Sequence, residues 1–309
     1  MAENFKTKVI INPHSANRST RRQWPGIAEG IKRSIGDFDW EFTTGPNTAP
    51  ELTRNALREG YEMVVGVGGD GTNNEIINGF FEADLAINPE AVYGMICRGT
   101  GSDLIRTLGI PRDPGEAARI LAGKRTRRID LGRLSFRDHR GREARRYFIN
   151  IASFGIGGEV DARVNQTTKA FGGWISFLYG SVRANFAYKN KSVDIELDGD
   201  SLGTRKIFNS AIANGQYFGG GMRVAPQARM DDGLFDIVIM GDLSFLESVR
   251  MARLIYKGDH VNLPKIESFR GKKLSATSEQ RVLLDVDGEQ PGILPASLEI
   301  IPGAIRIKV

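Results

Sequence analysis

The segment that most constrains the fold is a glycine-rich turn between an apolar run and a helical pattern. Residues 63–67 form a compact apolar run, typical of a buried strand, and Gly68-Gly69-Asp70-Gly71-Thr72 follows it directly. The residues after the turn, 75–81, predict a helix. Glycines let a backbone approach an anion closely, and a helix N-terminus presents N–H groups to it. The segment therefore predicts an α/β unit with an anion-binding loop, and a plain strand–helix turn is the alternative.

The first 130 residues alternate between short apolar runs and helical patterns. The other expected elements are strands at 8–12, 40–43 and 92–96 and helices at 20–35 and 49–59. Strands that alternate with helices are typical of a parallel sheet that is covered by helices. Residues 1–130 therefore predict an α/β domain with a parallel, Rossmann-like sheet.

The pattern changes near residue 130, because strand-like runs joined by Gly, Asp and Asn turns dominate from there. These runs lie at 146–152, 192–198, 206–213, 234–240, 281–286 and 297–301, with one helical stretch at 243–256. Residues 131–303 therefore predict a mainly antiparallel β-sandwich domain. A closing strand at 304–309 could belong to either domain, including a return to the first.

The composition indicates a folded chain without disulfides. Cys97 is the only cysteine among 309 residues, which excludes an intrachain disulfide and favours a reducing compartment. The first residues lack the apolar core of a signal peptide, and no run approaches the roughly 18 apolar residues of a membrane span. We therefore expect a cytoplasmic protein that meets a membrane only transiently, at its inner face.

The net charge of +5 favours acidic partners. Basic clusters at 18–22, 124–128 and 137–146 suit polyphosphates or anionic lipid headgroups, although solvated surface is the simpler interpretation of each residue. Helix-turn-helix, zinc-finger and RNP-type motifs are absent from the sequence, so a nucleic-acid partner is not expected.

Two further loops follow predicted strands in the same way as the glycine-rich turn. Asn12-Pro13-His14-Ser15-Ala16 follows the first strand, and Gly99-Thr100-Gly101-Ser102-Asp103 follows the strand at 92–96. Ligands of open α/β sheets bind at the carboxyl ends of strands, so the three loops are expected to converge on one ligand. None of them has the spacing of a Walker A motif or of a protein-kinase glycine loop.

The ordered series of motifs resembles the diacylglycerol kinase catalytic-domain superfamily, which includes bacterial soluble diacylglycerol kinases and sphingosine and ceramide kinases. The matching segments are N-P-x-S at 12–15, GGDGTNNE at 68–75, GTGSD at 99–103, IDLGR at 129–133, NG-x-x-x-GGG-x-x-x-AP at 214–226, DDGLFD at 231–236 and VDGE at 286–289. Two positions depart from the family pattern, since Ser102 replaces an asparagine and Ala16 replaces a glycine. The GGDGT string alone also occurs in NAD kinases and phosphofructokinases, so the order of the whole series carries the resemblance.

The resemblance implies that ATP is the phosphoryl donor and that Mg²⁺ assists the transfer. The residues expected to line the nucleotide are Asn12, Pro13, His14, Ser15, Ala16, Thr43, Gly68, Gly69, Asp70, Gly71, Thr72, Asn73, Asn74 and Thr100. Asp70, Asp103 and Asp130 each lie at or just after a strand end, and hard carboxylate oxygens suit magnesium. We expect these three carboxylates to orient the metal and the phosphates, while a helix N-cap is an equally good role for Asp103.

The segment Asp287-Gly288-Glu289 resembles the catalytic-base segment of the family. A carboxylate within hydrogen-bond reach of the acceptor hydroxyl could take its proton, and either Asp287 or Glu289 fits that role. Asp-Gly also favours a hairpin turn, which is the alternative that turn chemistry alone prefers.

A second metal site is implied by the resemblance of residues 231–234 to bacterial relatives. Asp232 would bind Mg²⁺ through its side chain, and Arg229 and Leu234 would bind it through their carbonyl oxygens. An ordinary Asp-Gly hairpin is the alternative.

Aromatic residues are dense over 171–188, with Arg183 among them and Lys189 and Lys191 just after. This segment is expected to form either a wall of a lipid site or an amphipathic part of the β-domain core. The sequence thus predicts an ATP-dependent lipid kinase that phosphorylates a lipid hydroxyl, such as that of diacylglycerol, in a cleft between two domains. An NAD kinase-like enzyme and a non-catalytic lipid-binding module are the alternatives, and a homodimer is left open.

Overall fold

The computed structural model describes residues 5–99, 101–159 and 188–309. The chain divides into two compact units. Unit 1 consists of Met1–Asp130 and Gly303–Val309, and unit 2 consists of Leu131–Pro302.

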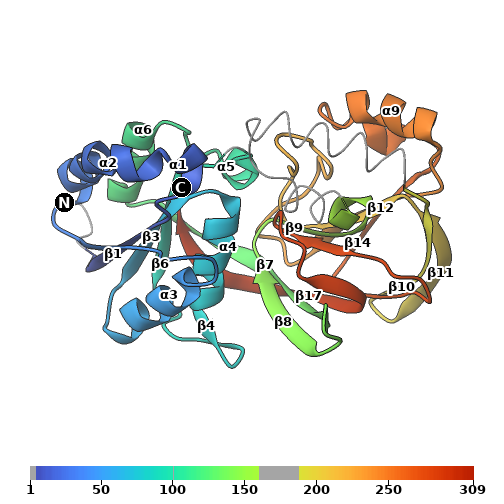
Figure 1. Ribbon diagram of the computed structural model, residues 1–309, viewed down its shortest axis with the longest axis horizontal. Coiled ribbons are helices and arrows are strands. Elements are labelled where there is room, and N and C mark those ends of the chain that lie inside the picture. The colour runs from blue at the N-terminus through green and yellow to red at the C-terminus, as the bar shows by residue number, and fades with distance from the viewer. Residues whose placement is uncertain (1–4, 100, 160–187) are drawn as a thin grey trace. The chain divides into compact units, whose positions relative to one another are not determined.

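Unit 1 is built around a parallel sheet (Figure 1). Its strands, in spatial order, are β2 (Asp39–Phe42), β1 (Thr7–Ile11), β3 (Met63–Gly68), β6 (Val92–Cys97) and the end of β17 (Gly292–Lys308). Every neighbouring pair in this order is parallel. The two central strands are buried along their whole length, because helices cover both faces of the sheet. The predicted parallel α/β architecture is therefore confirmed.

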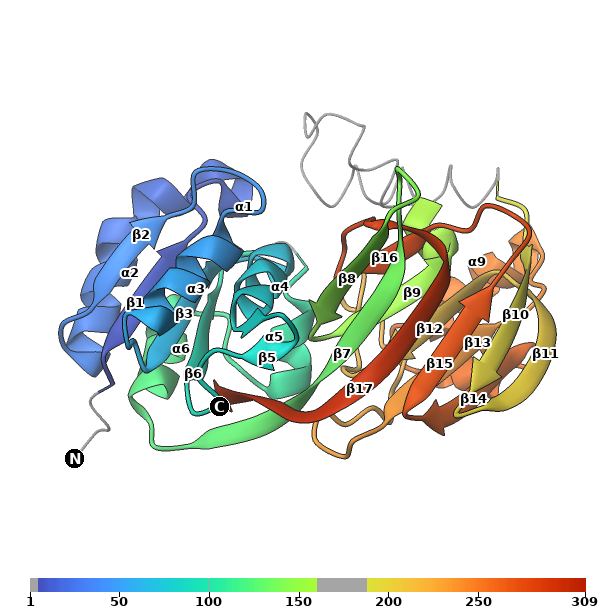
Figure 2. The ribbon, with the colours of Figure 1, turned by 90° about the horizontal axis from the view of Figure 1, so that it is seen from below.

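Four longer helices cover this sheet. Figures 1 and 2 show α2 (Thr20–Ile35) and α6 (Pro114–Ala122) on one face and α3 (Ala49–Arg58) and α4 (Asp70–Gly79) on the other. In α2 the buried residues Thr20, Trp24, Ile27 and Ile31 recur every three or four positions, which gives the helix one apolar stripe. Short elements complete the unit: α1 (Ser15–Arg18), α5 (Asp103–Leu108), and the hairpin of β4 (Phe81–Glu82) and β5 (Leu85–Ala86).

Unit 2 contains two layers of β-strands. One is an antiparallel sheet in the order β14 (Ile266–Gly271), β13 (Phe235–Met240), β12 (Asn209–Ala213), β9 (Ile151–Gly155) and β16 (Leu284–Val286). The other follows the order β11 (Asp200–Ile207), β10 (Lys191–Leu197), β15 (Lys273–Thr277) and β17, and β7 (Thr126–Asp138) pairs with both β17 and β8 (Glu143–Phe148).

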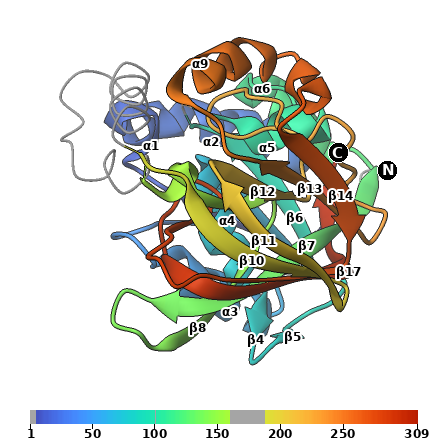
Figure 3. The ribbon, with the colours of Figure 1, turned by 90° about the vertical axis from the view of Figure 1, so that its right-hand side faces the viewer.

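The core of unit 2 lies between these layers. Phe148, Val193 and Leu298 of one layer pack in the same buried cluster as Phe154 and Phe235 of the other. Helix α9 (Phe245–Leu254) covers the outer face of the five-stranded sheet, and the short η1 (Asp259–Asn262) follows it (Figure 3). The predicted β-sandwich is confirmed, and no helix in the described ranges is long and apolar enough to cross a membrane.

Some elements differ from the sequence prediction. The helix expected at 75–81 begins at Asp70, so the glycine-rich turn is its first turn. The strand expected at 146–152 is two strands, β8 and β9, because the backbone at Ile149 and Asn150 turns its N–H groups towards Asp287. The closing strand forms the end of β17, where Arg306 and Ile307 pair with β6 of unit 1.

Candidate active site

Three loops meet at the carboxyl ends of β1, β3 and β6 in unit 1. The side-chain amide of Asn12 donates to Thr72 Oγ1 at 2.9 Å, and its backbone N–H donates to the Val67 carbonyl at 2.9 Å. A Cβ on Gly99 would lie 2.7 Å from the Cα of Gly69, so the second and third loops touch through their backbones. The sequence prediction placed these loops together, and their contacts agree with it.

Glycine is needed where the backbone of β3 enters α4. A Cβ on Gly68 would lie 2.6 Å from Thr72 Cβ, and Gly69 is the N-cap residue of the helix. The first turn of α4 therefore carries Asp70, Gly71 and Thr72, and its N–H groups have no partners within the helix. This end of the helix attracts negative charge, as a phosphate group requires.

Two carboxylates lie beside the helix N-terminus. The Asp103 N–H points to Asp70 Oδ2 at 3.3 Å, and a Cβ on Gly101 would lie 3.1 Å from Asp70 Oδ2 and 3.4 Å from Asp103 Oδ2. Asp103 is buried and its Oδ1 is 3.5 Å from the guanidinium of Arg106. The two carboxyl groups therefore flank the same glycine of the third loop.

Burial raises the pKa of Asp70, and N–H groups of the third loop together with the charge of Arg106 oppose this shift. Its Oδ1 is buried and has no hydrogen-bond partner within the described residues. A carboxylate oxygen in this position is costly unless a cation or a donor joins it. The site thus has an unused ligand atom.

These carboxylates fit a magnesium ion. Mg²⁺ is commonly bound by one or two carboxylates while phosphate and water oxygens complete its shell, and Asp70 and Asp103 supply two hard ligands beside the anion-binding turn. Within the described ranges, no group of three or more acidic, His or Cys side chains could hold a metal ion.

Three other predicted site residues are buried within unit 1. Asp130 lies buried in β7 and accepts the Gly303 N–H at 2.8 Å. Asn73 and Asn74 are fully buried in α4, and the Tyr93 hydroxyl donates to Asn73 Oδ1 at 2.8 Å. These side chains hold unit 1 together around the loops, and their contribution to ligand binding stays a prediction.

The remaining nucleotide-lining predictions fall at the loop ends. The Thr43 N–H donates to the Ile11 carbonyl at 2.9 Å, which places Thr43 at the carboxyl end of β2 beside the first loop. His14 is exposed, and its N–H donates to Asn12 Oδ1 at 2.9 Å. Pro13 is buried, and the Ser15 hydroxyl donates to the Asn12 carbonyl. Thr100 lies outside the described residues.

Three arginines around the third loop were not predicted as site residues. Arg106 and Arg112 donate to the carbonyls of Gly101 and Gly99, each at 3.1 Å, and the Arg98 guanidinium contacts Gln23 of α2. Guanidinium groups near a phosphate site neutralise charge that develops during phosphoryl transfer. Their spacing in the sequence matches no motif, although all three lie within ten positions of this loop.

The first loop contains three successive residues in the left-handed region. The φ angles of Ala16, Asn17 and Arg18 are 51°, 54° and 65°. This conformation costs an ordinary residue about 1–2 kcal/mol but costs glycine little. The family glycine that Ala16 replaces is therefore explained by the backbone, and Ala16 carries strain.

Ala16→Gly is expected to raise the free energy of unfolding by about 0.5–1 kcal/mol, because relief of strain exceeds the added chain entropy of glycine. Urea denaturation measures the change. Ala252→Gly, at an exposed position in the regular helix α9, is the matched control and should lower stability by about 1 kcal/mol. Equal losses in both variants would contradict the strain at position 16.

In unit 2 the two predicted base residues have different surroundings. Asp287 accepts three backbone N–H groups, from Ile149 at 2.9 Å, Asn150 at 3.1 Å and Ile151 at 2.9 Å. Glu289 Oε2 is 2.6 Å from the Arg146 guanidinium, and its side chain keeps 37% of its exposure. Asp287 is thus anchored to the backbone of the β8–β9 connection, whereas Glu289 is held by a side chain.

A third carboxylate next to this turn was missed by the sequence analysis. Asp285 is buried, Ser153 donates to its Oδ2 at 3.1 Å, and the Gly288 N–H donates to its Oδ1 at 3.0 Å. A Cβ on Gly157 would lie 2.6 Å from Ser153 Oγ, so small residues leave room for this polar cluster. Asp285 fixes the turn that carries Asp287 and Glu289. The alternation of apolar and acidic residues at 284–287 was the one available signal.

The second predicted metal site holds an arginine in this structure. Asp232 Oδ2 contacts the Arg270 guanidinium, whose Nε is also 3.5 Å from Asp236 Oδ2. Arg229 Nε is 3.6 Å from Asp231 Oδ1, and the Leu234 N–H donates to Asp232 Oδ1 at 3.2 Å. A cation already compensates Asp232, so these residues do not fit a magnesium ion unless Arg270 is displaced.

Arg270→Gln is expected to lower the free energy of unfolding by about 1–2 kcal/mol, because two partly buried carboxylates lose their counter-charge. A chelator should leave the melting temperature of the unchanged protein the same. Arg205→Gln is the control and should cost less than about 1 kcal/mol, because its partner Glu267 is more exposed than Asp232 and Asp236. A wild-type melting temperature that falls with chelator would instead support the metal site.

Residues 6–134 match the diacylglycerol kinase catalytic domain, and residues 150–309, more than half of the chain, match the domain described as YegS C-terminal NAD kinase beta sandwich-like. The chain belongs to the diacylglycerol kinase catalytic-domain superfamily. The expected resemblance is confirmed, and the protein is a kinase.

Two similar curated proteins are both named diacylglycerol kinase. The one from Staphylococcus carnosus is 29% identical over 293 residues, covering 94% of this chain and 91% of that protein. The one from Bacillus subtilis is 27% identical over 292 residues, with the same coverage.

Solved structures support the fold. A putative diacylglycerol kinase from Bacillus anthracis superposes with a TM-score of 0.79 at 22% identity, over 99% of this chain and 98% of that one. An NAD kinase from Archaeoglobus fulgidus in complex with ATP gives a TM-score of 0.53 at 13% identity, over 98% and 93%.

Proposed function

We propose that this kinase transfers the γ-phosphoryl group of ATP to a hydroxyl of diacylglycerol or a closely related lipid. The observation that carries the proposal is the meeting of three strand-end loops at a helix N-terminus beside the carboxylates of Asp70 and Asp103. The names of the curated relatives support the lipid acceptor, and the ATP in the NAD kinase complex supports the donor.

The loops of unit 1 would bind and orient the triphosphate. N–H groups of the first turn of α4 face the anion, and Asn12 fixes Thr72 beside them. Arg106 and Arg112 stabilise the third loop through its carbonyls, so that their positive charge stays beside the phosphates. Phosphoryl transfer depends mainly on such positioning and on charge neutralisation.

Asp70 and Asp103 would hold Mg²⁺ in this proposal. When bound, the ion would offset the negative charge of the phosphates. The buried Oδ1 of Asp70 supplies a ligand atom that has no protein partner within the described residues, and Arg106 keeps Asp103 in place.

The turn at 287–289 would take the proton of the lipid hydroxyl. Asp285 and the backbone donors around Asp287 fix the turn, and Glu289 is oriented by Arg146. A proton acceptor must be ionised and aimed at the hydroxyl, and these contacts restrict the orientation of both carboxylates. We propose that one of them accepts the proton and that the other positions it.

The test combines γ-labelled ATP, magnesium and dispersed diacylglycerol, with the labelled product identified by mass spectrometry. Labelled phosphatidic acid is the expected result. Transfer to NAD with none to lipid would favour an NAD kinase-like enzyme, and lipid binding without ATP consumption would favour a non-catalytic module. A cytoplasmic location with transient contact at the inner membrane face follows from a lipid substrate and forms part of the proposal.

A further inference from the structure

Helix α9 and the two residues after it, 255–256, expose most of the large apolar side chains that reach solvent in the described residues. Phe245, Leu246, Val249 and Tyr256 retain 41%, 78%, 42% and 52% of their exposure, and Trp40 and Leu85 are the other large exposed hydrophobics in those ranges. Four of the six thus lie within residues 245–256. A cluster of exposed apolar side chains marks an interaction site more often than single exposed apolar side chains do.

The opposite face of α9 is already used for packing. Ser248, Met251 and Ile255 are buried, and Met251 and Ile255 pack with Val238 and Met240 of β13 on the outer face of the sheet. The buried positions are spaced by three and four residues, as one helix face requires. The folding of α9 therefore does not explain the apolar residues on its outer face.

The outer face is basic as well as apolar. Arg250, Arg253 and Lys257 are exposed beside the apolar residues. Glu247 is paired with Lys265 at 2.8 Å, which leaves Asp259 as the nearby carboxylate in the following segment. The face formed by residues 245–257 therefore combines exposed apolar side chains with an excess of positive charge.

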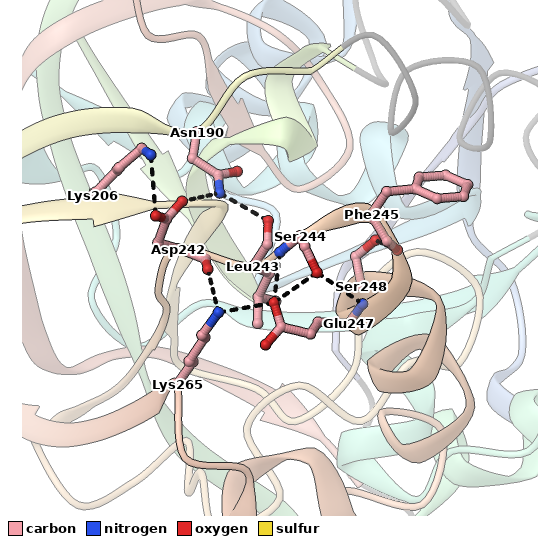
Figure 4. A network of polar contacts seen from close by, with 9 residues as sticks. All are labelled: Asn190, Lys206, Asp242, Leu243, Ser244, Phe245, Glu247, Ser248 and Lys265. Atoms are coloured by element: carbon pink, nitrogen blue, oxygen red, sulfur yellow. Dashed lines mark hydrogen bonds and ion pairs between the residues drawn. The ribbon is translucent and has the colours of Figure 1, made fainter.

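A polar network fixes the N-terminus of α9 (Figure 4). Ser244 and Glu247 form a capping box, and Lys265 bonds both Glu247 and the Asp242 carbonyl. Asp242 also accepts from Lys206 at 3.0 Å and from Asn190 at 2.6 Å. Figure 4 shows the ring of Phe245 pointing away from these contacts.

The network keeps its charges at physiological pH. The hydrogen bond from Lys265 is the largest cause that lowers the pKa of Glu247 to about 2, and contacts from Asn190 and Lys206 lower the pKa of Asp242. Both carboxylates stay ionised and paired with lysines. The cations on the outer face are therefore not neutralised by these two acids.

We infer that the outer face of α9, residues 245–257, docks onto an anionic membrane surface. The inference rests on the proposed function, since a lipid acceptor must be reached at a membrane. Apolar side chains enter the headgroup–acyl boundary, while arginine and lysine pair with anionic headgroups. A second copy of the chain is a poorer occupant, because two symmetric α9 faces would bring their cations together.

Vesicle sedimentation tests the docking without any need for turnover. The full chain is mixed with vesicles of phosphatidylcholine alone or with vesicles of equal parts phosphatidylcholine and phosphatidylglycerol. Binding is expected to the anionic vesicles and to weaken with added salt. Leu246→Gln with Val249→Gln should weaken it about tenfold or more. Arg250→Gln with Arg253→Gln should weaken it about fivefold for each cation removed.

Matched controls lie outside residues 245–257 and outside the other basic clusters. Leu85→Gln removes a leucine of similar exposure, and Arg119→Gln with Lys272→Gln removes the same charge from other exposed positions. Both control proteins should bind as the wild type does. Wild-type binding by the two α9 variants would overturn the inference, as would equal binding to neutral and anionic vesicles. A dimer that these substitutions abolish, with vesicle binding unchanged, would also overturn it.

The kinase assay separates this inference from the proposed function. The α9 variants should phosphorylate lipid in detergent micelles at the wild-type rate and lose activity only on anionic vesicles. If the wild type phosphorylates no lipid in either form, the proposed function fails, while sedimentation still decides the docking.

Discussion

Asp70→Asn is expected to lower turnover by about a thousandfold, the largest effect of any single change considered for this chain. The asparagine keeps the size of the side chain and an acceptor for the third loop, but it removes the negative charge beside the anion site. Steady-state kinetics with labelled ATP measure the loss. Asp37→Asn, at an exposed position in the same unit, is the control and should leave turnover unchanged.

The same variant also has an expected pH signature. Because burial raises the pKa of Asp70, the folded protein binds this proton more tightly than the unfolded chain does. The stabilisation is full below the unfolded pKa of about 4 and is lost as the pH rises through the folded value. The stability of the wild type relative to Asp70→Asn should therefore fall as the pH rises from about 4 through the folded pKa.

Urea denaturation at several pH values measures this difference, and magnesium with ATP should reduce it by binding the ionised carboxylate of the wild type. A difference that does not change with pH, together with normal turnover, would remove Asp70 from the mechanism.

Asp287→Asn is expected to destabilise unit 2 by about 2–4 kcal/mol as well as to lower turnover. Three buried backbone N–H groups point at its carboxylate, and an amide nitrogen cannot accept from them. Thermal unfolding monitored by circular dichroism measures the loss, and turnover is compared at a temperature where the variant is folded.

Glu289→Gln separates the two roles, because Glu289 is more exposed and its main partner is Arg146. Its melting temperature should stay close to that of the wild type, and its turnover should fall about a hundredfold if it accepts the proton. Normal turnover for Glu289→Gln, with a deep loss in folded Asp287→Asn, would assign the acceptor to Asp287. Normal turnover in both would exclude the turn from catalysis.

The parts of the fold that could be predicted are those that depend on short, continuous stretches of sequence. Apolar runs such as 63–67 form the buried parallel strands, and glycines where the backbones of neighbouring loops touch marked the site. The start of α4 was placed too late, because Gly69 and Gly71 suggested a loop, although glycine here serves as the N-cap and first turn of the helix. Strand β7 was missed, although the alternation of buried and less buried residues over 133–137 is the ordinary pattern of a half-exposed strand.

The contacts that define individual roles could not be predicted, since they join residues far apart in the chain. Asp287 meets the backbone at 149–151, and Asp232 meets Arg270, through strand pairing that no local motif records. Arg98 likewise meets Ser19 and Gln23, which lie more than 70 positions away in the chain. The position of the site at the carboxyl ends of the strands could therefore be predicted, whereas the partners of its side chains could not.

Strand β17 has a consequence for how the protein is made. Its last residues pair with β6 and close the sheet of unit 1, yet they follow all of unit 2 in the chain. During synthesis, the sheet of unit 1 cannot be completed until unit 2 has left the ribosome. Until then β6, an apolar strand, has an open edge that invites wrong pairing. A ribosome that stops before residue 303 would release a chain with that edge uncovered, which is a substrate for quality control.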